Sequence, residues 1–407
     1  MKIPPAHFII LLYIILNGGC VPDDFYAEPS EQFNPKSTSN LTKSQKNKTQ
    51  LELSLDEFAD VIKHWRDQHP QANQTYYQLD QITNIADNIL LYQRNNGGWA
   101  TNNNPLRVLS IYEVNQEQHN KVLTDTSLDN RNVYPQIRYL AEVYQLTGNI
   151  EYQEAVIAGI EYILQNQYEN GGWAHSPPRT DDYYGHITFA DEVMSGVLTL
   201  LRDIDYGNHP FEFISKPLRQ RCAAAYEKGH NLLLNLQIIV QGKATVWAGQ
   251  YDKTTLRPVP ARSYELAGLQ SWESVAVVRY LMAEKKPDQR EIDAIEAAVH
   301  WFESSAIQGL RLDKIETEPV QFKYYTSHYD LIAVSDPSAP PIWARFYDIE
   351  TGQPFMANRD GTKVLALADV ARERRTGYEW YGYWPRQLIE EEYPSWQDRV
   401  ASSNKDR

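Results

Sequence analysis

Apolar residues recur along most of the chain at the spacing that is typical of α-helices. They lie three and four residues apart and so share one helical face, and the clearest faces cover residues 137–144, 156–163, 193–204 and 276–281. This rhythm begins near residues 53–58. Strand-like runs are short and cover 246–248 and 342–347. The pattern predicts a mainly α protein with long loops and a few short strands.

One block of sequence occurs twice. Residues 90–100 read LLYQRNNGGWA and residues 164–174 read LQNQYENGGWA, and a weaker copy covers residues 234–248. In both clear copies a helical run ends at Asn-Gly, where glycine can adopt the left-handed conformation that closes a helix. Helix pairs that repeat with equivalent loops stack around a common axis. The repeat therefore predicts an irregular α/α toroid, a barrel of helical hairpins, with its loops gathered at one end.

The tryptophan of each block has two interpretations. The ring can fasten the loop to the end of the preceding helix, and we favour this role for Trp99. The ring can instead stack on a sugar. For Trp173, which precedes the loop 177–179, both interpretations stay open, and we include it among the candidate substrate-binding residues.

The N-terminus has the features of an export signal. Lys2 is followed by an apolar run over residues 8–16 and then by Gly18, Gly19 and Cys20. The run is too short to span a bilayer, and it fits a secretory signal peptide over residues 1–20. Cys20 after two glycines resembles a bacterial lipoprotein cleavage site. We expect a secreted protein or an outer-membrane or cell-surface lipoprotein of a bacterium, which meets the membrane only through a lipid anchor at Cys20.

The remaining chain divides into three parts. Residues 21–50 are polar and cannot bury enough apolar surface to fold, so they are predicted to be a disordered tether. One folded domain is expected over 51–395, followed by a C-terminal tail over 396–407. The two cysteines cannot build a disulfide scaffold. We expect a monomer.

Charge and composition exclude several classes of protein. The chain has 39 Lys and Arg residues against 53 Asp and Glu residues, a net charge of −14. A surface of this sign argues against nucleic acid or an anionic membrane as the partner. Aromatic residues make up 12% of the chain, a share that is common in proteins that bind sugar rings. No zinc, phosphate-loop or dinucleotide pattern is present in the sequence.

Unusual polar residues concentrate in four stretches, at residues 125–131, 186–194, 246–265 and 344–361. Asp129 and Asp191 precede predicted helices. Acids at such positions cap the helix and interact favourably with its dipole. Spacing alone therefore leaves open whether these two acids carry chemistry.

Six ordered blocks carry a family resemblance. Between residues 80 and 386 the chain reads NQYENGGW, HITFADEVM, VWAGQYD, ARSYEL, RFYDIETGQPFMANRDG and ERRTGYEWYGYWP. This series is similar to that of the pectate lyases of polysaccharide lyase family 10. The resemblance implies a helical toroid with a groove between two lobes. It also implies Ca²⁺-assisted β-elimination of polygalacturonate, the backbone of pectin, which gives 4,5-unsaturated oligouronides.

The resemblance also implies roles for particular residues. The arginine that removes the C5 proton falls on Arg262. The calcium-linked acids fall on Asp129 and Asp191, with Asn130 as a further ligand. Calcium binds several oxygen ligands, which these side chains can supply together with substrate carboxylates. Because the pKa of a guanidinium is normally above about 12, Arg262 acts as a base only where its surroundings favour deprotonation.

Further basic residues match substrate-binding positions of the family. They are Arg345, Arg359 and Lys243. The planar fork of arginine suits a uronate carboxylate, and fixed cations stabilise the negative charge that develops on proton removal. The alternatives are structural ion pairs. Arg262 could pair with Glu265 or Glu273, and Arg345 and Arg359 could pair with Asp348 and Asp360.

Several positions depart from the family blocks. Arg131 replaces a glycine, residues 190–192 read Ala-Asp-Glu in place of Asn-Asp-Asp, and Trp272 and Tyr251 replace glycine and histidine. Arg131 could compete with the metal or contact another carboxylate. These changes could redirect or abolish activity. Two other functions therefore stay open: a glycoside hydrolase that uses Asp129 and Asp191, and a non-catalytic pectin-binding surface protein.

Overall fold

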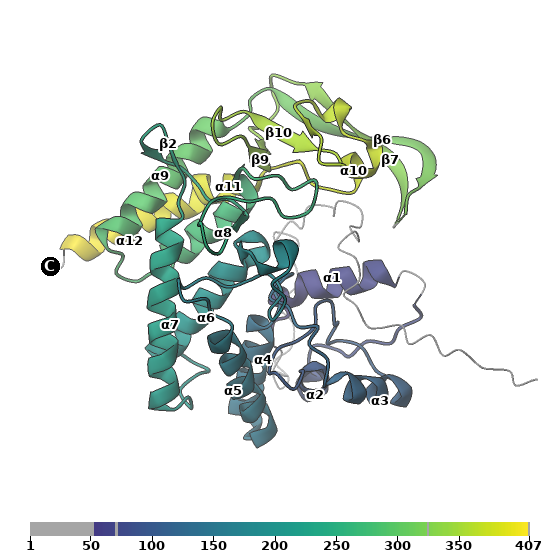
Figure 1. The fold of residues 1–407 in the computed structure, drawn as a ribbon, viewed down its shortest axis with the longest axis vertical. Coiled ribbons are helices and arrows are strands. Elements are labelled where there is room, and N and C mark those ends of the chain that lie inside the picture. The colour runs from purple at the N-terminus through teal and green to yellow at the C-terminus, as the bar shows by residue number, and fades with distance from the viewer. Residues whose placement is uncertain (1–52, 70–71, 324, 406–407) are drawn as a thin grey trace, which may run out of the picture.

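The computed structural model describes residues 53–69, 72–323 and 325–405 (Figure 1). The predicted signal peptide, the Cys20 anchor and the tether over 21–50 lie outside the described residues. None of the described helices is both long and apolar enough to cross a membrane.

Helices make up nearly half of the described chain and carry the labels of Figure 1. The α-helices are α1 (Ala59–Gln68), α2 (Ile82–Tyr92), α3 (Ile111–Asn120), α4 (Tyr134–Thr147), α5 (Ile150–Gln165), α6 (Val193–Tyr206), α7 (Lys216–Asn235), α8 (Ser271–Met282), α9 (Gln289–Ser305), α10 (Arg372–Thr376), α11 (Trp384–Gln387) and α12 (Tyr393–Lys405). Short 3₁₀ turns are η2 (Asp56–Phe58), η3 (Asp182–Gly185), η4 (Ala190–Glu192) and η5 (Leu367–Asp369), and η6 (Leu388–Glu392) is a π-helix.

The helices stack as antiparallel hairpins. The pairs α4 and α5, α6 and α7, and α8 and α9 pack tightly within each hairpin, and successive hairpins contact one another through α4, α6 and α8 on one side and α5, α7 and α9 on the other. Figure 1 shows α4 to α7 side by side. The predicted helical repeat is therefore present. The predicted toroid is not observed, since no closed barrel exists among the described residues. After α9 the chain leaves the stack to form a β-rich part, and α11 returns to α8.

The Gly-Gly-Trp blocks join one hairpin to the next. Gly97 and Gly171 both have a positive φ, and a Cβ on either would lie only 2.2 Å and 2.5 Å from the carbonyl oxygens of Ala158 and Lys228. These oxygens belong to α5 and α7, the outer helices of the following hairpins. Glycine is therefore needed both for the backbone conformation and for the close approach. Because α2 and α5 end several residues earlier, the glycines lie in the following loop and do not cap the helices directly.

The tryptophans of the repeat are structural. The indole Nε1 of Trp99 donates to the carbonyl oxygen of Ile89 over 2.8 Å, and that of Trp173 donates to Ile163 over 2.9 Å. Trp247 repeats the contact with a carbonyl oxygen of α7. The prediction that Trp99 fastens a helix end is thereby confirmed.

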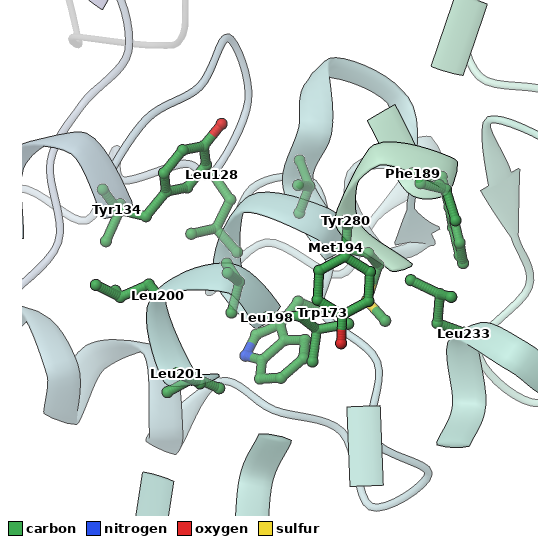
Figure 2. Packing of buried hydrophobic residues seen from close by; sticks show 14 of the residues in the cluster. Leu128, Tyr134, Trp173, Phe189, Met194, Leu198, Leu200, Leu201, Leu233 and Tyr280 are labelled. Carbon is green, nitrogen blue, oxygen red and sulfur yellow. The ribbon is translucent and has the colours of Figure 1, made fainter. Parts of the chain in front are cut away.

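The prediction that Trp173 binds sugar is wrong. Its side chain has an exposed fraction of 0%, and Figure 2 shows the ring within the core beside Met194 and Leu198. The ring is covered because α6 and α7 pack directly against it. A Cβ on Gly229 of α7 would lie 2.7 Å from the Trp173 ring. No face of the ring is left for a ligand.

The strands are concentrated in the C-terminal third. They are β1 (Ile187–Thr188), β2 (Ile239–Val240), β3 (Lys243–Ala244), β4 (Gln250–Tyr251), β5 (Leu269–Gln270), β6 (Leu310–Gln321), β7 (Thr326–Ser335), β8 (Trp343–Ala344), β9 (Phe346–Tyr347), β10 (Pro354–Ala357), β11 (Lys363–Val364) and β12 (Tyr381–Gly382). A four-stranded sheet has the order β11-β10-β9-β5, and β6 pairs with β7 as a long hairpin. A second, smaller hydrophobic core lies in this part, around Tyr264, Phe346 and Trp380.

Two predictions about strands and one about the C-terminus can be compared with the structure. The strand predicted at 342–347 is confirmed as β8 and β9. No strand forms at 246–248, where Trp247 is held by side-chain contacts instead. Over the expected C-terminal tail at 396–407, α12 continues to Lys405 and Trp396 is only 4% exposed. That indole packs against the main core and fixes the helix.

Candidate active site

A small pocket lies where loops of the helical stack meet the β-rich part. Of the residues predicted from sequence, it brings together Asp191, Arg262 and Arg345. Its other lining residues are His175, Tyr183, Ala190, Gly249, Gln250, Val259, Ala261, Glu265, Gln270, Glu273, Phe346 and Tyr378. The segments that meet here are far apart in the chain, so only the fold places them together.

The helix repeat explains why acids converge on this place. Asp129 lies in the loop before α4, Asp191 in η4 just before α6, and Glu273 in the first turn of α8. These three helices are neighbours in the stack. Their N-termini therefore lie close together, and the partial positive charge at a helix N-terminus stabilises carboxylates.

The carboxyl groups of Asp129 and Asp191 lie close together and interact directly. Burial, the charge of Asp129 and the charge of Glu273 raise the pKa of Asp191 well above its ordinary value. Burial also opposes ionisation of Asp129, but His175 and Arg262 lower the pKa of that carboxyl below its usual range. Nε2 of His175 lies 3.3 Å from Oδ1 of Asp129. The two carboxyl groups therefore differ in acidity, and Asp191 is the weaker acid of the pair.

Both acids lie in strained turns. Asp191 has φ 51° and Glu192 has φ 61°, while Asn130 and Arg131 have φ 55° and 53°. Left-handed backbone costs a residue with a Cβ about 1–2 kcal/mol, and such strain is often found at functional sites. The backbone N–H of Asp191 donates to Oε2 of Glu273 over 3.3 Å, which helps to hold the turn.

Arg262 is paired with Glu265 and also lies close to the acids. Nη1 of Arg262 is 3.1 Å from Oε1 of Glu265, so one of the two structural ion pairs considered above is present. Burial opposes ionisation of Glu265, but Arg262 and Arg345 lower its pKa. The Tyr378 hydroxyl donates to the same carboxylate over 2.8 Å. Arg262 nevertheless lines the pocket and interacts electrostatically with both Asp129 and Asp191.

Arg345 is buried and does not pair with Asp348. Nη2 of Arg345 lies 2.5 Å from Oε1 of Glu273. Its guanidinium carbon lies 4.2 Å from the centre of the Trp272 ring and 4.7 Å from that of Tyr378. Trp272, one of the departures from the family blocks, therefore covers Arg345. Within the described residues, the buried Nε of Arg345 has no hydrogen-bond partner, so a donor remains available beside the pocket.

Arg359 is near the pocket but does not line it. Nη2 of Arg359 lies 2.7 Å from Oε1 of Glu373, not against Asp360, and its side chain is 33% exposed. Its carbonyl oxygen accepts a hydrogen bond from the Ser263 hydroxyl, the neighbour of Arg262. Arg359 is therefore tied to the loop that carries Arg262 and keeps part of its guanidinium accessible.

Two residues that were predicted to bind ligands, Lys243 and Asn130, do not line the pocket. Lys243 is exposed on β3 and is not among the residues that line the pocket. Nδ2 of Asn130 donates to Oδ1 of Asn102 over 3.1 Å. His175, Glu265 and Tyr378 contact site residues but were not predicted as site residues. Glu265 stands three positions after Arg262, and both Glu265 and Tyr378 lie in the family blocks quoted above.

The donors fit a calcium ion only in part. Among the described residues, no group of three or more Asp, Glu, His or Cys side chains is arranged to hold a metal ion by itself. Oδ1 of Asp129, however, is buried and has no hydrogen-bond partner among the described residues. Calcium takes six to eight oxygen ligands. Asp129 and Asp191 could supply two or more, and substrate carboxylates and water would have to supply the rest.

Comparison with solved structures gives the class of the protein. A family 10 polysaccharide lyase from Cellvibrio cellulosa is 28% identical with a TM-score of 0.63, and the match covers 84% of this chain and 98% of that one. An aspartate-to-alanine mutant of a family 10 polysaccharide lyase from the same organism, in complex with trigalacturonic acid, is 26% identical with a TM-score of 0.64 and coverages of 84% and 99%. Both structures are those of polysaccharide lyases.

The sequence gives the family. The profile described as pectic acid lyase matches residues 93–389. The chain therefore belongs to the pectic acid lyase family, and it is a polysaccharide lyase. The resemblance seen in the six sequence blocks is confirmed. No curated protein gives a significant match.

Proposed function

We propose that the enzyme cleaves polygalacturonate by calcium-assisted β-elimination and releases 4,5-unsaturated oligouronides. The observation that carries the proposal is one pocket lined by Asp191, Arg262 and Arg345, with Asp129 interacting with both Asp191 and Arg262. The trigalacturonic acid bound by the Cellvibrio relative supports the choice of substrate. The N-terminal sequence further supports secretion or a lipid anchor at Cys20.

The substrate explains why acids and arginines are needed together. Each uronate has a carboxylate beside its C5–H bond, and removal of that proton places more negative charge on the carboxylate. Bound calcium would neutralise this charge and stabilise its increase. Asp129 and Asp191 would hold the ion, and Asp191 would lose its proton on binding. Arg345 and Arg359 would position uronate carboxylates through their guanidinium groups. The exposed Lys243 would contact another carboxylate further along the polygalacturonate substrate.

Arg262 is the proposed base. Arg262 first loses a proton to solvent water, and its neutral guanidine then takes the C5 proton. The C5–H electrons form the C4–C5 double bond, and the glycosidic oxygen leaves C4 and takes a proton from water. Glu265 stabilises the protonated guanidinium, so Arg262 must give up this ion pair before it can act. The Tyr378 hydroxyl and the Arg345 charge still stabilise Glu265 when that contact is lost.

The acid pair argues against the glycoside hydrolase. Inverting hydrolases place their two carboxyl groups about 6.5–9.5 Å apart and retaining ones about 5–5.5 Å apart, which leaves room for water or the sugar. The carboxyl groups of Asp129 and Asp191 interact directly with each other, so they lie closer together than either spacing.

The test is an assay of polygalacturonate digestion with and without Ca²⁺. Ultraviolet absorbance of the unsaturated ends and the yield of reducing ends are measured together. We expect both signals with Ca²⁺ and neither with EGTA, and Asp129→Asn to lose the response to Ca²⁺. Reducing ends without absorbance would indicate hydrolysis. Tight binding with neither signal would indicate a pectin-binding protein, and undiminished activity in EGTA would remove calcium from the mechanism.

A further inference from the structure

Arg131 connects three segments around the acid pair. Its Nη2 lies 2.5 Å from Oε1 of Glu192, and its Nε lies 3.3 Å from Oδ2 of Asp60. All three side chains are about one-third exposed, at 33%, 34% and 38%. The expectation that Arg131 could contact another carboxylate is confirmed. Its partners are Glu192 and Asp60, not the acids of the pair.

Two of the connected residues are neighbours of the acids. Arg131 lies two positions after Asp129, and Glu192 directly follows Asp191. Arg131 and Glu192 both have a positive φ, so each belongs to the same strained turn as one of the acids. A strained turn persists only where surrounding contacts determine it. The Arg131–Glu192 ion pair joins one turn to the other and so fixes the distance between them.

The third connected residue comes from outside the region matched by the family profile. Asp60 lies on α1, and the match begins at residue 93. The same helix carries His64, which interacts electrostatically with Asp129 and Arg262. In Figure 1, α1 lies between the helical stack and the β-rich part. It therefore lies against the site, with Asp60 holding one edge of the Arg131 guanidinium.

We propose that Arg131 is a positioning residue, which holds Asp129 and Asp191 in register for a divalent cation through its ion pairs with Glu192 and Asp60. The inference rests on the proposed function. Arg131 need not touch the substrate. Loss of its ion pairs would let the two turns move independently, so that the carboxylates meet a cation less often in the correct geometry.

The test uses the full chain with Arg131→Gln, Glu192→Gln and the double variant. Calcium affinity is measured by calorimetry without substrate, and kcat and KM are measured on polygalacturonate. Residues that orient metal ligands typically change affinity or activity by about 10–100-fold. We expect each single variant to lose about tenfold in calcium affinity and in kcat, with KM within about twofold. The double variant should lose no more than either single variant, and Arg131→Glu with Glu192→Arg should recover part of the loss.

Two further variants separate positioning from stability. Arg131→Gly suits the backbone, since glycine adopts φ near 53° without strain, and it should keep the melting temperature while losing calcium affinity. Arg221→Gln removes an ion pair of equal length between α7 and Glu161 of α5, with exposed fractions of 52% and 31%, and should change neither affinity nor kcat.

The outcomes are distinguishable. Arg131 variants that match Arg221→Gln in calcium affinity and kcat, or a double variant whose losses are the product of the single losses, would overturn this inference alone. A wild-type enzyme that binds no calcium or releases no unsaturated product would overturn the proposed function and the inference with it.

Discussion

The carboxyl groups of Asp129 and Asp191 interact directly although they come from different hairpins of the helical stack. Each lies in a strained loop just before an inner helix, α4 or α6. The contact therefore results from the packing of successive hairpins, not from a local motif. This packing brings together two acids that repel each other when both are ionised. A bound divalent cation would relieve this repulsion.

Replacement of Arg262 should stop catalysis and leave substrate binding. We expect Arg262→Ala to reduce kcat by about 10²–10⁴-fold, the usual contribution of a general base, because the group nearest the C5 proton is lost. Binding of polygalacturonate, measured by calorimetry, should change little. Arg262→Lys is the control that keeps a cation beside Glu265. An active Arg262→Ala enzyme would show that another group takes the proton.

Trp173 should determine stability and not affinity. Trp173→Ala should reduce the free energy of unfolding by about 3–5 kcal/mol, since a large buried side chain leaves a cavity. Trp173→Phe should cost less, mainly through the lost hydrogen bond to Ile163. Chemical denaturation gives the stability and kinetics give KM. A raised KM with unchanged stability would restore a sugar-binding role to this ring.

Alanine substitutions at two glycines with positive φ should distinguish the cost of backbone strain from the cost of close packing. Gly171→Ala meets the Lys228 carbonyl at 2.5 Å, whereas a Cβ at Gly242 meets nothing within 4 Å. Both variants should lose about 1–2 kcal/mol to left-handed backbone, and Gly171→Ala should lose about 1–3 kcal/mol more to overpacking. Thermal and denaturant unfolding measure the difference. Equal losses would mean that the hairpin contact adjusts freely.

Glu379 should make stability depend on pH. Burial raises the pKa of Glu379, although Arg345 and Lys63 partly oppose this. Between the usual glutamate pKa and the raised value, the folded protein keeps a proton that the unfolded chain has lost, so stability falls as pH rises. Glu379→Gln should abolish this fall, and its free energy of unfolding relative to wild type should increase with pH.

Glu161 should give a pH dependence of stability opposite to that of Glu379. Its ion pair with Arg221 lowers the pKa of Glu161, so its contribution to stability is present above the usual glutamate pKa and is lost in acid. Glu161→Gln should therefore become less stable relative to wild type as pH rises. Denaturant titrations from pH 4 to pH 8 check both variants. Parallel pH profiles for the two would contradict the assigned shifts.

Much of the helical architecture could be predicted from the sequence. The apolar spacing located α4, α5, α6 and α8, because one face of each helix must be buried wherever the helix packs. The repeat of Gly-Gly-Trp located equivalent loops, since only glycine permits the close approach at Gly97 and Gly171. The β6–β7 hairpin was missed, because most of its side chains are at least partly exposed and the usual apolar alternation is weak.

The sequence by itself determined the helical repeat, the family and the residue types available for chemistry. Only the tertiary structure decided three other contacts: Glu273 for Arg345, Glu192 for Arg131, and the core for Trp173. These contacts join residues from different hairpins or from both parts of the molecule. Local spacing specifies which face of a helix is apolar, but the side chain that meets a given charge depends on how separate elements pack.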